Sequence, residues 1–286
     1  MMHSIPGGAS AKPFVTHHNA LDMDLFLRIA PELYLKRLVV GGMEKVFEIN
    51  RNFRNEGLST KHNPEFTMLE FYTAFVDYQY QMDFTENMLR EIENLSGINT
   101  KIFSKEFERL SMDESIVKHN SLNNEDLKDI DVLKKFCDKN SIKLEGVNTV
   151  GNIKNIIFET TVEENLIKPT FIYNYPIEIS PLARSLDKDG SIAERFELFV
   201  NGKELGNSFS ELNDPKEQAK RFDLQVEEKN AGDEEAMHFD KDYIEALEYG
   251  LAPCAGVGIG IDRLIMLLSG RESIRDVVLF PQLKNK

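Results

Sequence analysis

The sequence predicts an α+β fold with an antiparallel β-sheet flanked by helices. Segments that alternate apolar and polar residues lie toward both ends of the chain, and a stretch with helical periodicity separates them. Asn201-Gly202 joins two of the alternating segments, and this dipeptide is the strongest short signal for a β-hairpin. Strands grouped in this way are typical of antiparallel sheets.

The first third of the chain carries three strand patterns and two helix patterns. Pro31 and Gly41-Gly42 bracket an apolar stripe at helical spacing, so we predict a helix that starts at Pro31. A second helix is predicted to stop at Gly97. The predicted strands lie within 21–30, 45–54 and 65–76, and the predicted helices lie within 31–42 and 83–95.

A change of composition suggests how the rest of the chain is divided. Residues 97–168 are rich in Lys, Asp, Glu, Asn and Ile, and helices are expected within 123–140 and 150–166. Strand patterns resume at 170–176 and 194–209. A helix is expected near 242–250. Within 256–270, a strand that contains several glycines is expected to lead directly into a last helix. We therefore expect a first half of the sheet at 1–96, a helical insertion at 97–168 and a second half at 169–286.

Composition excludes several classes of protein. With 41% hydrophobic and 29% charged residues, the chain of 286 residues is typical of a soluble globular protein. No apolar run approaches the roughly 20 residues that span a bilayer, and no signal peptide opens the chain. The two cysteines fit a reduced cytoplasm. A net charge of −14 argues against a broad basic surface for nucleic acid, but it fits an acidic site for a cationic ligand, and it leaves room for RNA held locally.

The predicted strand pair at 45–54 and 65–76 has an unusual polar face. Period-two alternation places Glu48, Asn50, Asn52 and Arg54 on one face of the first strand, with Glu56 following. On the second strand it places Phe66, Met68, Glu70 and Tyr72 on one face. An arginine fork suits phosphate, an aromatic ring can stack on a base, and Glu70 with Tyr72 could hold an ammonium group. An exposed hairpin with cross-strand ion pairs would explain Arg54 and Glu56 but not the Phe-Met-Glu-Tyr face.

The Asn201-Gly202 hairpin brings two carboxylates together. A two-residue turn pairs Val200 with Lys203 and Phe199 with Glu204, which leaves Glu197 diagonal to Glu204 on the same face. Two hard oxygen ligands of this kind suit Mg²⁺ that is also bound to phosphate. A solvated face whose glutamates pair with lysines gives the same pattern and is the better interpretation of this pair alone. Asn207, Phe209 and Glu211 follow by period two, and they join the same face only if the strand bulges at Gly206.

The glycine-rich stretch "AGVGIGIDRL" does not have the G-x-G-x-x-G spacing of a dinucleotide-binding loop. Its informative residue is Arg263, a cation in the first turn of an apolar helix, where the helix dipole disfavours it. An anionic ligand at that helix end would explain it, and so would an ion pair with Asp262. Glu32, in the first turn after Pro31, is explained by ordinary helix stabilisation.

Taken together, four segments resemble the catalytic domain of class II aminoacyl-tRNA synthetases, in particular the bacterial-type lysyl-tRNA synthetases. "FRNEGLSTKHNPEFTMLEFY" is similar to motif 2 of that family, and "GVGIGIDRL" is similar to motif 3. "RIAPELYLKRLVVGG" and "GNSFSELND" resemble the lysine-specific forms of the neighbouring segments. The match covers both ends of the chain, and the resemblance implies the class II catalytic fold.

The resemblance also implies roles for individual residues. On the ATP side, Arg54 resembles the arginine that contacts the α-phosphate and the amino-acid carboxylate, and Phe66 and Arg263 resemble the residues on the two sides of the adenine. Glu56, His62 and Asn63 match residues around the adenine and outer phosphates. Glu197 and Glu204 match the Mg²⁺ carboxylates. On the lysine side, Glu211 and Tyr72 resemble the partners of the ε-ammonium. The residues that resemble contacts to the α-amino and carboxylate end are Gly8, Glu32, Glu70 and Asn207, and Phe209 resembles a residue that lines the pocket.

The implied activity is that of a lysine–tRNA ligase. Lysine and ATP would form lysyl-adenylate and pyrophosphate, and the lysyl group would pass to the 3′ end of tRNA(Lys), in the cytoplasm and without a membrane partner. The implied catalytic residues are Arg54 and Arg263, with Mg²⁺ as cofactor. The family's anticodon-binding domain and motif 1 are expected to be missing from this stretch of sequence. Because motif 1 builds much of the family's homodimer interface, dimerisation is expected for the full-length family.

Two other functions are compatible with the same motifs. One is the paralogue that attaches a lysine-like amino acid to elongation factor P; that group tends to carry alanine where this chain has Gly258. The other is a regulator that binds ATP or lysine without catalysis. Such proteins typically lose the motif 2 or motif 3 arginine, whereas Arg54 and Arg263 are both present.

Overall fold

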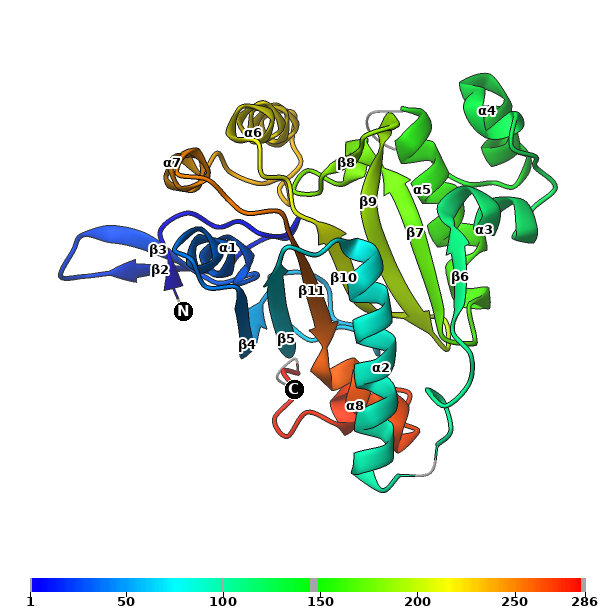
Figure 1. Cartoon of the computed structure of the whole chain (residues 1–286), viewed down its shortest axis with the longest axis horizontal. Helices are drawn as coiled ribbons and strands as arrows, with labels where there is room; N and C mark the ends of the chain where they lie inside the picture. Colours follow the sequence, from blue (N-terminus) through cyan, green and yellow to red (C-terminus); the bar gives the residue numbers. More distant parts are fainter. Residues whose placement is uncertain (1, 99, 145–148, 284–286) are drawn as a thin grey trace. The chain divides into compact units, whose positions relative to one another are not determined.

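The computed structural model describes residues 2–98, 100–144 and 149–283, and within them the chain forms two compact units. The first unit comprises Met1–Val76 and Glu211–Lys286, and the second comprises Asp77–Ser210. Figure 1 traces the elements of both units. The strands of both units pair mostly antiparallel and are accompanied by helices, so the predicted α+β class is confirmed.

The first unit is built on the strand pair that the sequence predicted. Strand β4 (Lys45–Phe53) pairs antiparallel with β5 (Glu65–Ala74), and β5 pairs antiparallel with β11 (Cys254–Gly260). Glu48 lies opposite Glu70, and Asn52 lies opposite Phe66, so the polar faces of the two strands coincide. A separate small sheet is formed by β1 (Met2–His3), β2 (Val15–His18) and β3 (Met23–Leu27), and the last of these falls within the predicted first strand.

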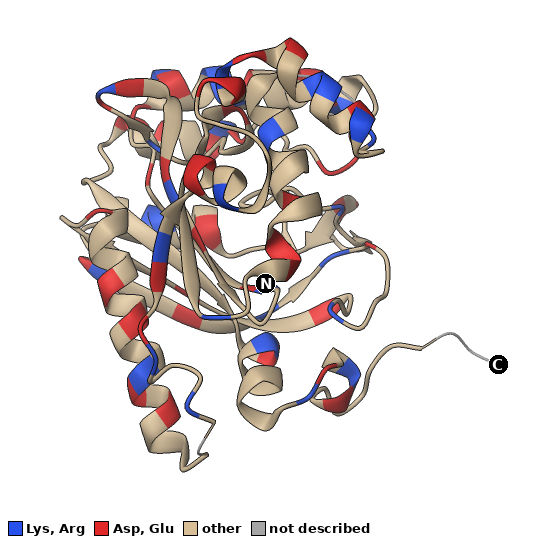
Figure 2. Ribbon diagram, turned by 90° about the vertical axis from the view of Figure 1, so that its right-hand side faces the viewer, with Lys and Arg blue, Asp and Glu red and all other residues tan. Residues whose placement is uncertain are grey.

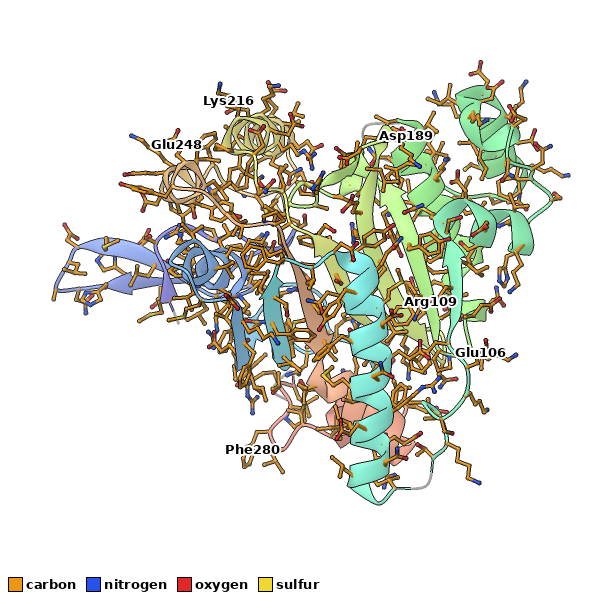
Figure 3. The ribbon with its side chains drawn as sticks, in the orientation of Figure 1. Glu106, Arg109, Asp189, Lys216, Glu248 and Phe280 are labelled. Carbon is orange, nitrogen blue, oxygen red and sulfur yellow. The ribbon has the colours of Figure 1, made fainter. Side chains whose placement is uncertain are left out.

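Helices of the first unit pack on these strands. Helix α1 (Glu32–Val40) begins directly after Pro31 and lies against β4, β5 and α7 (Lys241–Glu248). Helix α8 (Ile261–Ser269) follows β11 directly, as predicted, and a short 3₁₀ turn, Ile274–Asp276, lies beyond it. Helix α6 (Pro215–Asn230) was not predicted, although the Asp214 side chain accepts hydrogen bonds from the N–H groups of Lys216 and Glu217 and caps it. Figure 3 shows Lys216 on α6 and Glu248 on α7 projecting outward.

The second unit is a four-stranded ladder with one parallel pair. Its strands run in the order β10 (Lys203–Ser210), β9 (Asp189–Val200), β7 (Thr170–Pro176) and β6 (Glu108–Ser111), and β8 (Ser185–Leu186) also pairs with β9. Strand β6 runs parallel to β7 and was not predicted.

Helices of the second unit enclose its core. The segment expected to be helical holds α3 (Met112–His119), α4 (Ile130–Lys139) and α5 (Val150–Thr161), with 3₁₀ turns at Asp126–Lys128 and Glu163–Asn165. A further 3₁₀ turn spans Ile177–Ile179. The helices and strands share an apolar core that includes Ile116, Leu133, Ile157, Phe158, Ile172 and Phe199.

Helix α2 (Tyr78–Ser96) is longer than predicted. It begins at Tyr78 rather than near residue 83, because the Asp77 side chain accepts a hydrogen bond from the Tyr80 N–H and caps the helix there. Its end at Gly97, with a φ of 69°, agrees with the prediction. The helix lies along β9 and β10.

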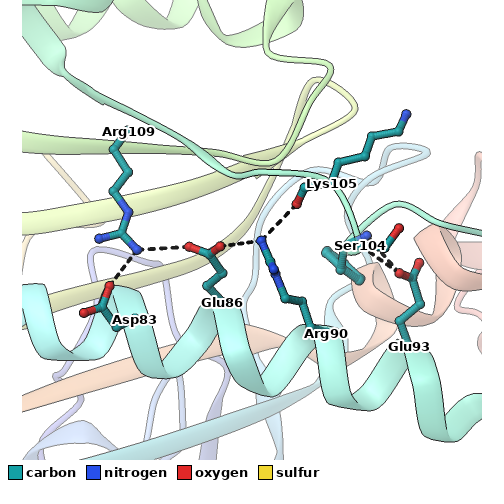
Figure 4. Close-up of polar contacts among 8 residues, drawn as sticks. Asp83, Glu86, Arg90, Glu93, Ser104, Lys105 and Arg109 are labelled. Carbon is teal, nitrogen blue, oxygen red and sulfur yellow. Dashed lines mark hydrogen bonds and ion pairs between the residues drawn. The ribbon is translucent and has the colours of Figure 1, made fainter.

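Side chains of α2 hold the segment that leads to β6. Figure 4 shows Arg109 bound to Asp83 and Glu86, and Arg90 bound to Glu86 and to the Lys105 carbonyl. Farther along, the buried Glu93 carboxylate accepts hydrogen bonds from the Thr100 hydroxyl and from the N–H groups of residues 102, 103 and 104. Burial raises the pKa of Glu93, but these four hydrogen bonds outweigh it and hold the pKa below its usual value.

Replacing Glu93 with glutamine should lower the free energy of unfolding by about 2 kcal/mol, because an amide presents N–H groups where the backbone supplies donors. Urea denaturation measures the change. Glu91→Gln, an exposed position on the same helix, is the matched control and should alter stability by less than about 0.5 kcal/mol. Equal midpoints for the two variants would show that the Glu93 hydrogen bonds add nothing.

Acidic and basic positions are interspersed along the helices in Figure 2, despite the net charge of −14. Within residues 2–98, 100–144 and 149–283, no helix has both the length and the apolar character needed to cross a membrane.

Candidate functional site

A cluster of buried charges lies inside the first unit. Glu32 comes from the first turn of α1, Glu70 from β5, and Glu211 from the residue that follows β10 in the sequence; all three are less than a tenth exposed. The ammonium of Lys36, which is fully buried, is 2.5 Å from a Glu32 carboxylate oxygen and forms a second ion pair with Glu211. The buried Tyr72 hydroxyl donates to Glu70 at 2.6 Å.

Local structure explains why these side chains converge. Glu32 and Lys36 are four residues apart on α1 and therefore share a helix face. Glu70 and Tyr72 are two residues apart on β5 and share a sheet face. The Glu211 N–H donates to the carbonyl of Cys254 at 2.9 Å, which fixes its backbone to the start of β11.

Burial and mutual repulsion dominate the electrostatics of the cluster. Burial raises the pKa of Glu70 to about 8, and the Glu32 charge adds to the rise, while Tyr72, Lys36 and Arg54 oppose it. Burial also raises the pKa of Glu211 well above its usual value, against the attraction of Lys36. For Lys36, burial lowers the pKa, but Glu211 and Glu32 outweigh it and the pKa lies well above its usual value.

The cluster is chemically suited to a cationic ligand. It contains three carboxylates, Glu32, Glu70 and Glu211, and one lysine ammonium. Carboxylates crowded at low dielectric are stabilised by added positive charge. A ligand that brought ammonium groups into this cluster would offset the burial and the mutual repulsion that raise the pKa values of Glu70 and Glu211.

Glycines leave space for the side chains of this cluster. Gly256 and Gly258 on β11 lie opposite Tyr72 and Glu70. A Cβ at Gly256 would lie 2.3 Å from a ring carbon of Tyr72 and 2.6 Å from a Glu211 carboxylate oxygen. Gly8 has a φ of 87°, and a Cβ there would lie 2.9 Å from the Glu32 Cβ. The sequence showed the glycine run but not this role; the signal was glycine at alternate positions of a strand that pairs with Glu70 and Tyr72.

Most of the residues predicted for ATP lie on β5, in the loop between β4 and β5, and in the first turn of α8. The Arg54 guanidinium lies over the Phe66 ring, 5.1 Å from its centroid. The Arg263 guanidinium is 3.2 Å from the His62 ring nitrogen. These contacts bring Arg54 together with Phe66, and Arg263 together with His62.

Asp262, Asn63 and Glu56 do not take part in these two side-chain pairs. The Asp262 carboxylate, considered above as a partner for Arg263, accepts the Thr67 N–H at 2.6 Å. The Asn63 amide donates to the Glu65 carbonyl at 2.6 Å. Glu56 lies exposed in the loop after Arg54. The structure therefore joins Asn63 to the backbone of this strand pair and leaves Glu56 at its surface.

Two buried side-chain amides lie on β4, in the strand that leads to Arg54. Asn50 and Asn52 lie opposite Met68 and Phe66, on the face that leads to Arg54. Among the residues that the structure describes, neither side-chain amide has a hydrogen-bond partner. Buried amides without partners cost about 1–3 kcal/mol each, so this part of β4 suits a polar ligand or ordered water. The sequence placed both residues on the polar face but assigned them no role.

In the second unit, the hairpin of β9 and β10 has the predicted register. Val200 pairs with Lys203 and Phe199 with Glu204, around a turn in which Asn201 and Gly202 both have positive φ. The register then shifts between Glu204 and Gly206, which confirms the predicted bulge. After the bulge, Asn207 lies opposite Glu197 and Phe209 lies opposite Arg195.

The hairpin carboxylates fit a hard cation only together with another ligand. The Glu197 carboxylate accepts hydrogen bonds from Arg195 at 2.5 Å and from the Tyr175 hydroxyl at 2.9 Å, neither of which was predicted. Burial raises the pKa of Glu197 to about 7; Arg195 opposes the rise and Glu204 adds to it. No group of three or more His, Cys, Asp or Glu suited to a metal occurs among the described residues. Two adjacent carboxylates still match Mg²⁺, which commonly takes one or two protein carboxylates together with substrate phosphates.

Comparisons with known proteins agree with this chemistry. The family described as tRNA synthetases class II (D, K and N) matches residues 1–284. Lysine–tRNA ligases of Pseudomonas savastanoi pv. phaseolicola and Pseudomonas aeruginosa are 56% and 57% identical over 293 residues, covering 99% of this chain and 59% and 58% of those proteins. The lysine–tRNA ligase of Nitrosomonas europaea is 57% identical over 295 residues, covering 100% of this chain and 59% of that protein. The chain thus spans about three fifths of the length of these relatives.

Proposed function

Because the chain belongs to the class II tRNA synthetase family (D, K and N), we propose that it is the catalytic part of a lysine–tRNA ligase. It would activate L-lysine with ATP and transfer the lysyl group to the 3′ end of tRNA(Lys). The observation that carries the proposal is the buried cluster of Glu32, Glu70 and Glu211, since a substrate with two ammonium groups supplies the positive charge that the cluster lacks.

The cluster and the family resemblance support a set of proposed lysine contacts. We assign the ε-ammonium to Glu211 and Tyr72, and the α-amino and carboxylate end to Gly8, Glu32 and Glu70. Exclusion of a neutral side chain follows from burial, because a neutral chain would leave the Glu211 charge without its ligand partner. By resemblance alone, Asn207 contacts the same end of the substrate and Phe209 lines its pocket.

The ATP contacts rest on the Arg54–Phe66 and Arg263–His62 pairs. Phe66 would stack on one side of the adenine and Arg263 would lie on the other, near the γ-phosphate. Arg54 would contact the α-phosphate and the lysine carboxylate. Glu56, His62 and Asn63 are assigned to the adenine and the outer phosphates by resemblance.

The proposed reaction needs no protein base. The ionised lysine carboxylate attacks the α-phosphorus, a carboxylate–phosphorus bond forms, and the bond to pyrophosphate breaks. Arg54 and Arg263 would hold the phosphates in line and stabilise the charge that develops on them. Mg²⁺ bound to Glu197 and Glu204 would neutralise phosphate charge. The terminal ribose hydroxyl of the tRNA then attacks the lysyl carbonyl, an ester bond forms, the bond to AMP breaks, and the hydroxyl proton passes to the departing AMP phosphate.

Lysine-dependent exchange of labelled pyrophosphate into ATP tests the first step. We expect exchange with L-lysine and none with L-aspartate or L-asparagine, the other substrates suggested by the family description. No lysine-dependent exchange by the protein would contradict the proposal. Charging of tRNA(Lys), measured against modification of elongation factor P, then separates the ligase from the paralogue.

Replacing Glu197 with glutamine should raise the KM for ATP about tenfold and leave the lysine KM unchanged, because it removes one carboxylate proposed to bind the metal–nucleotide complex. Higher Mg²⁺ should recover part of the loss, and EDTA should abolish exchange by the wild-type protein. Glu194→Gln, on the opposite face of β9, is the control. If both variants respond alike to Mg²⁺, Glu197 has no role in metal binding.

Homodimerisation and a cytoplasmic location are further proposals that rest on the family resemblance. Sedimentation of the purified protein at several concentrations tests the first of them.

A further inference from the structure

Lys36 is a buried cation that the proposed reaction does not use. Its side chain is fully buried, and its ammonium pairs with Glu32, one turn earlier on α1, and with Glu211, next to the start of β11. The Tyr243 ring of α7 lies 6.0 Å from the ammonium. One cation therefore ties together two carboxylates that are far apart in the sequence.

Stability alone explains this arrangement poorly. Taking an ammonium and its carboxylates out of water carries a desolvation cost that the ion pairs offset only when their geometry is good. Replacing such a buried ion pair by apolar residues of similar volume is often neutral or stabilising. A fully buried lysine between two carboxylates is therefore a costly way to join α1 to β11.

The two carboxylates are the ones proposed to bind opposite ends of the substrate. Glu211 is assigned to the ε-ammonium, and Glu32 to the α-amino and carboxylate end. Each carboxylate has two oxygens, so each can accept from Lys36 and from a ligand at the same time.

We propose that Lys36 is a positioning residue for lysine recognition, which holds the carboxylates of Glu32 and Glu211 aimed at the two ends of the substrate. This inference rests on the proposed function. Without the internal ammonium, a buried carboxylate takes up a proton or turns away, and a protonated carboxyl attracts a substrate ammonium far less.

The first test compares KM values in lysine-dependent ATP–pyrophosphate exchange. Lys36→Met keeps most of the side-chain length and removes the charge, and it should raise the lysine KM about 30-fold while the ATP KM changes less than threefold. Lys36→Arg restores a cation that can reach both carboxylates, and its lysine KM should be at least about fivefold lower than that of Lys36→Met.

Arg37→Met is the matched control. Arg37 is the next residue on α1, and its guanidinium pairs with Asp240 at 3.0 Å. Its loss should lower stability and leave the ratio of lysine KM to ATP KM as in the wild type. An unchanged ratio in Lys36→Met, or equal lysine KM values for Lys36→Met and Lys36→Arg, would overturn the positioning role.

A second measurement does not need a folded variant. In the wild-type protein labelled with ¹⁵N at lysine Nζ, the fully buried Lys36 ammonium should give a signal protected from solvent exchange. Saturating L-lysine should shift this signal, whereas ATP alone should not; a signal that does not change when L-lysine is added would overturn the inference.

If the wild-type protein shows no lysine-dependent exchange, the proposed function itself fails and this inference fails with it. Normal wild-type exchange with an unaffected Lys36→Met variant rejects the inference alone.

Discussion

Replacing Glu211 with glutamine should raise the lysine KM of ATP–pyrophosphate exchange by about 100-fold, while the ATP KM changes less than about threefold. The side chain is only 2% exposed, so little solvent is present to replace its charge. Glutamine keeps the shape and one acceptor oxygen, but it loses the charge that would pair with the ε-ammonium. The loss of one charge from a buried pair costs about 3 kcal/mol, which corresponds to the stated change.

The control for Glu211→Gln is Glu217→Gln, in the first turn of α6. Glu217 is partly exposed and pairs with Arg221 on its own helix, so its loss should leave both KM values close to those of the wild type. A Glu211→Gln variant in which the lysine and ATP KM values rise equally would show that Glu211 acts on the fold as a whole. It would then contradict the assignment of Glu211 to the substrate side chain.

The polar face of β4 and β5 and the β9–β10 hairpin could be predicted from sequence because both depend on local rules. Period-two alternation fixes which side chains share a face, and the Asn-Gly turn fixes the register of the strands that it joins. Even the bulge beyond Glu204 followed from the need to bring two sets of polar residues to one face. The Tyr175 contact of Glu197 could not be predicted, because Tyr175 comes from β7 and reaches Glu197 only through tertiary packing. The Arg195 contact was missed, although Arg195 is two residues from Glu197 on β9 and shares its face.

The central ion pair escaped prediction for a different reason. A glutamate followed four residues later by a lysine is the usual pattern of an exposed pair on a helix surface. Glu32 and Lys36 have that spacing, yet both are buried, and the third member of the group, Glu211, lies 175 positions beyond Lys36 in the numbering. Only the packing of α1 against the sheet distinguishes the buried pair from an exposed one.

Two elements were missed because their sequences lack an apolar pattern. Helix α6 buries polar residues such as Gln218, Arg221 and Gln225 beside Phe222, so its inner face does not show as an apolar stripe. Strand β6 is only four residues long, and its sequence, "ERLS", holds a single apolar residue. Its parallel pairing with β7 depends on partners supplied by the rest of the chain.

Replacing Gly256 with alanine should be the most damaging single methyl addition to the proposed lysine site. The new Cβ would meet a ring carbon of Tyr72 at 2.3 Å and a carboxylate oxygen of Glu211 at 2.6 Å, so both side chains must move. Overpacking of this kind costs about 2 kcal/mol of stability, and the displaced Glu211 would leave Lys36 without one of its partners. We expect the lysine KM to rise by more than about 100-fold, with a smaller change in the ATP KM.

Gly258→Ala is the matched control, because it adds the same methyl group two residues along the same face of β11. There the nearest atom is the flexible end of Met68, at 3.1 Å, which can move aside more readily than an aromatic ring bonded to Glu70. Its lysine KM should therefore rise at least about tenfold less than that of Gly256→Ala, and its thermal stability should stay closer to that of the wild type. If the two variants have equal lysine KM values, the space beside Tyr72 and Glu211 does not limit lysine binding. Only a methyl group at position 256 meets Tyr72 and Glu211, whereas one at position 258 meets Met68. Equal KM values would therefore mean that the two glycines are needed for the strand itself and not for the lysine site.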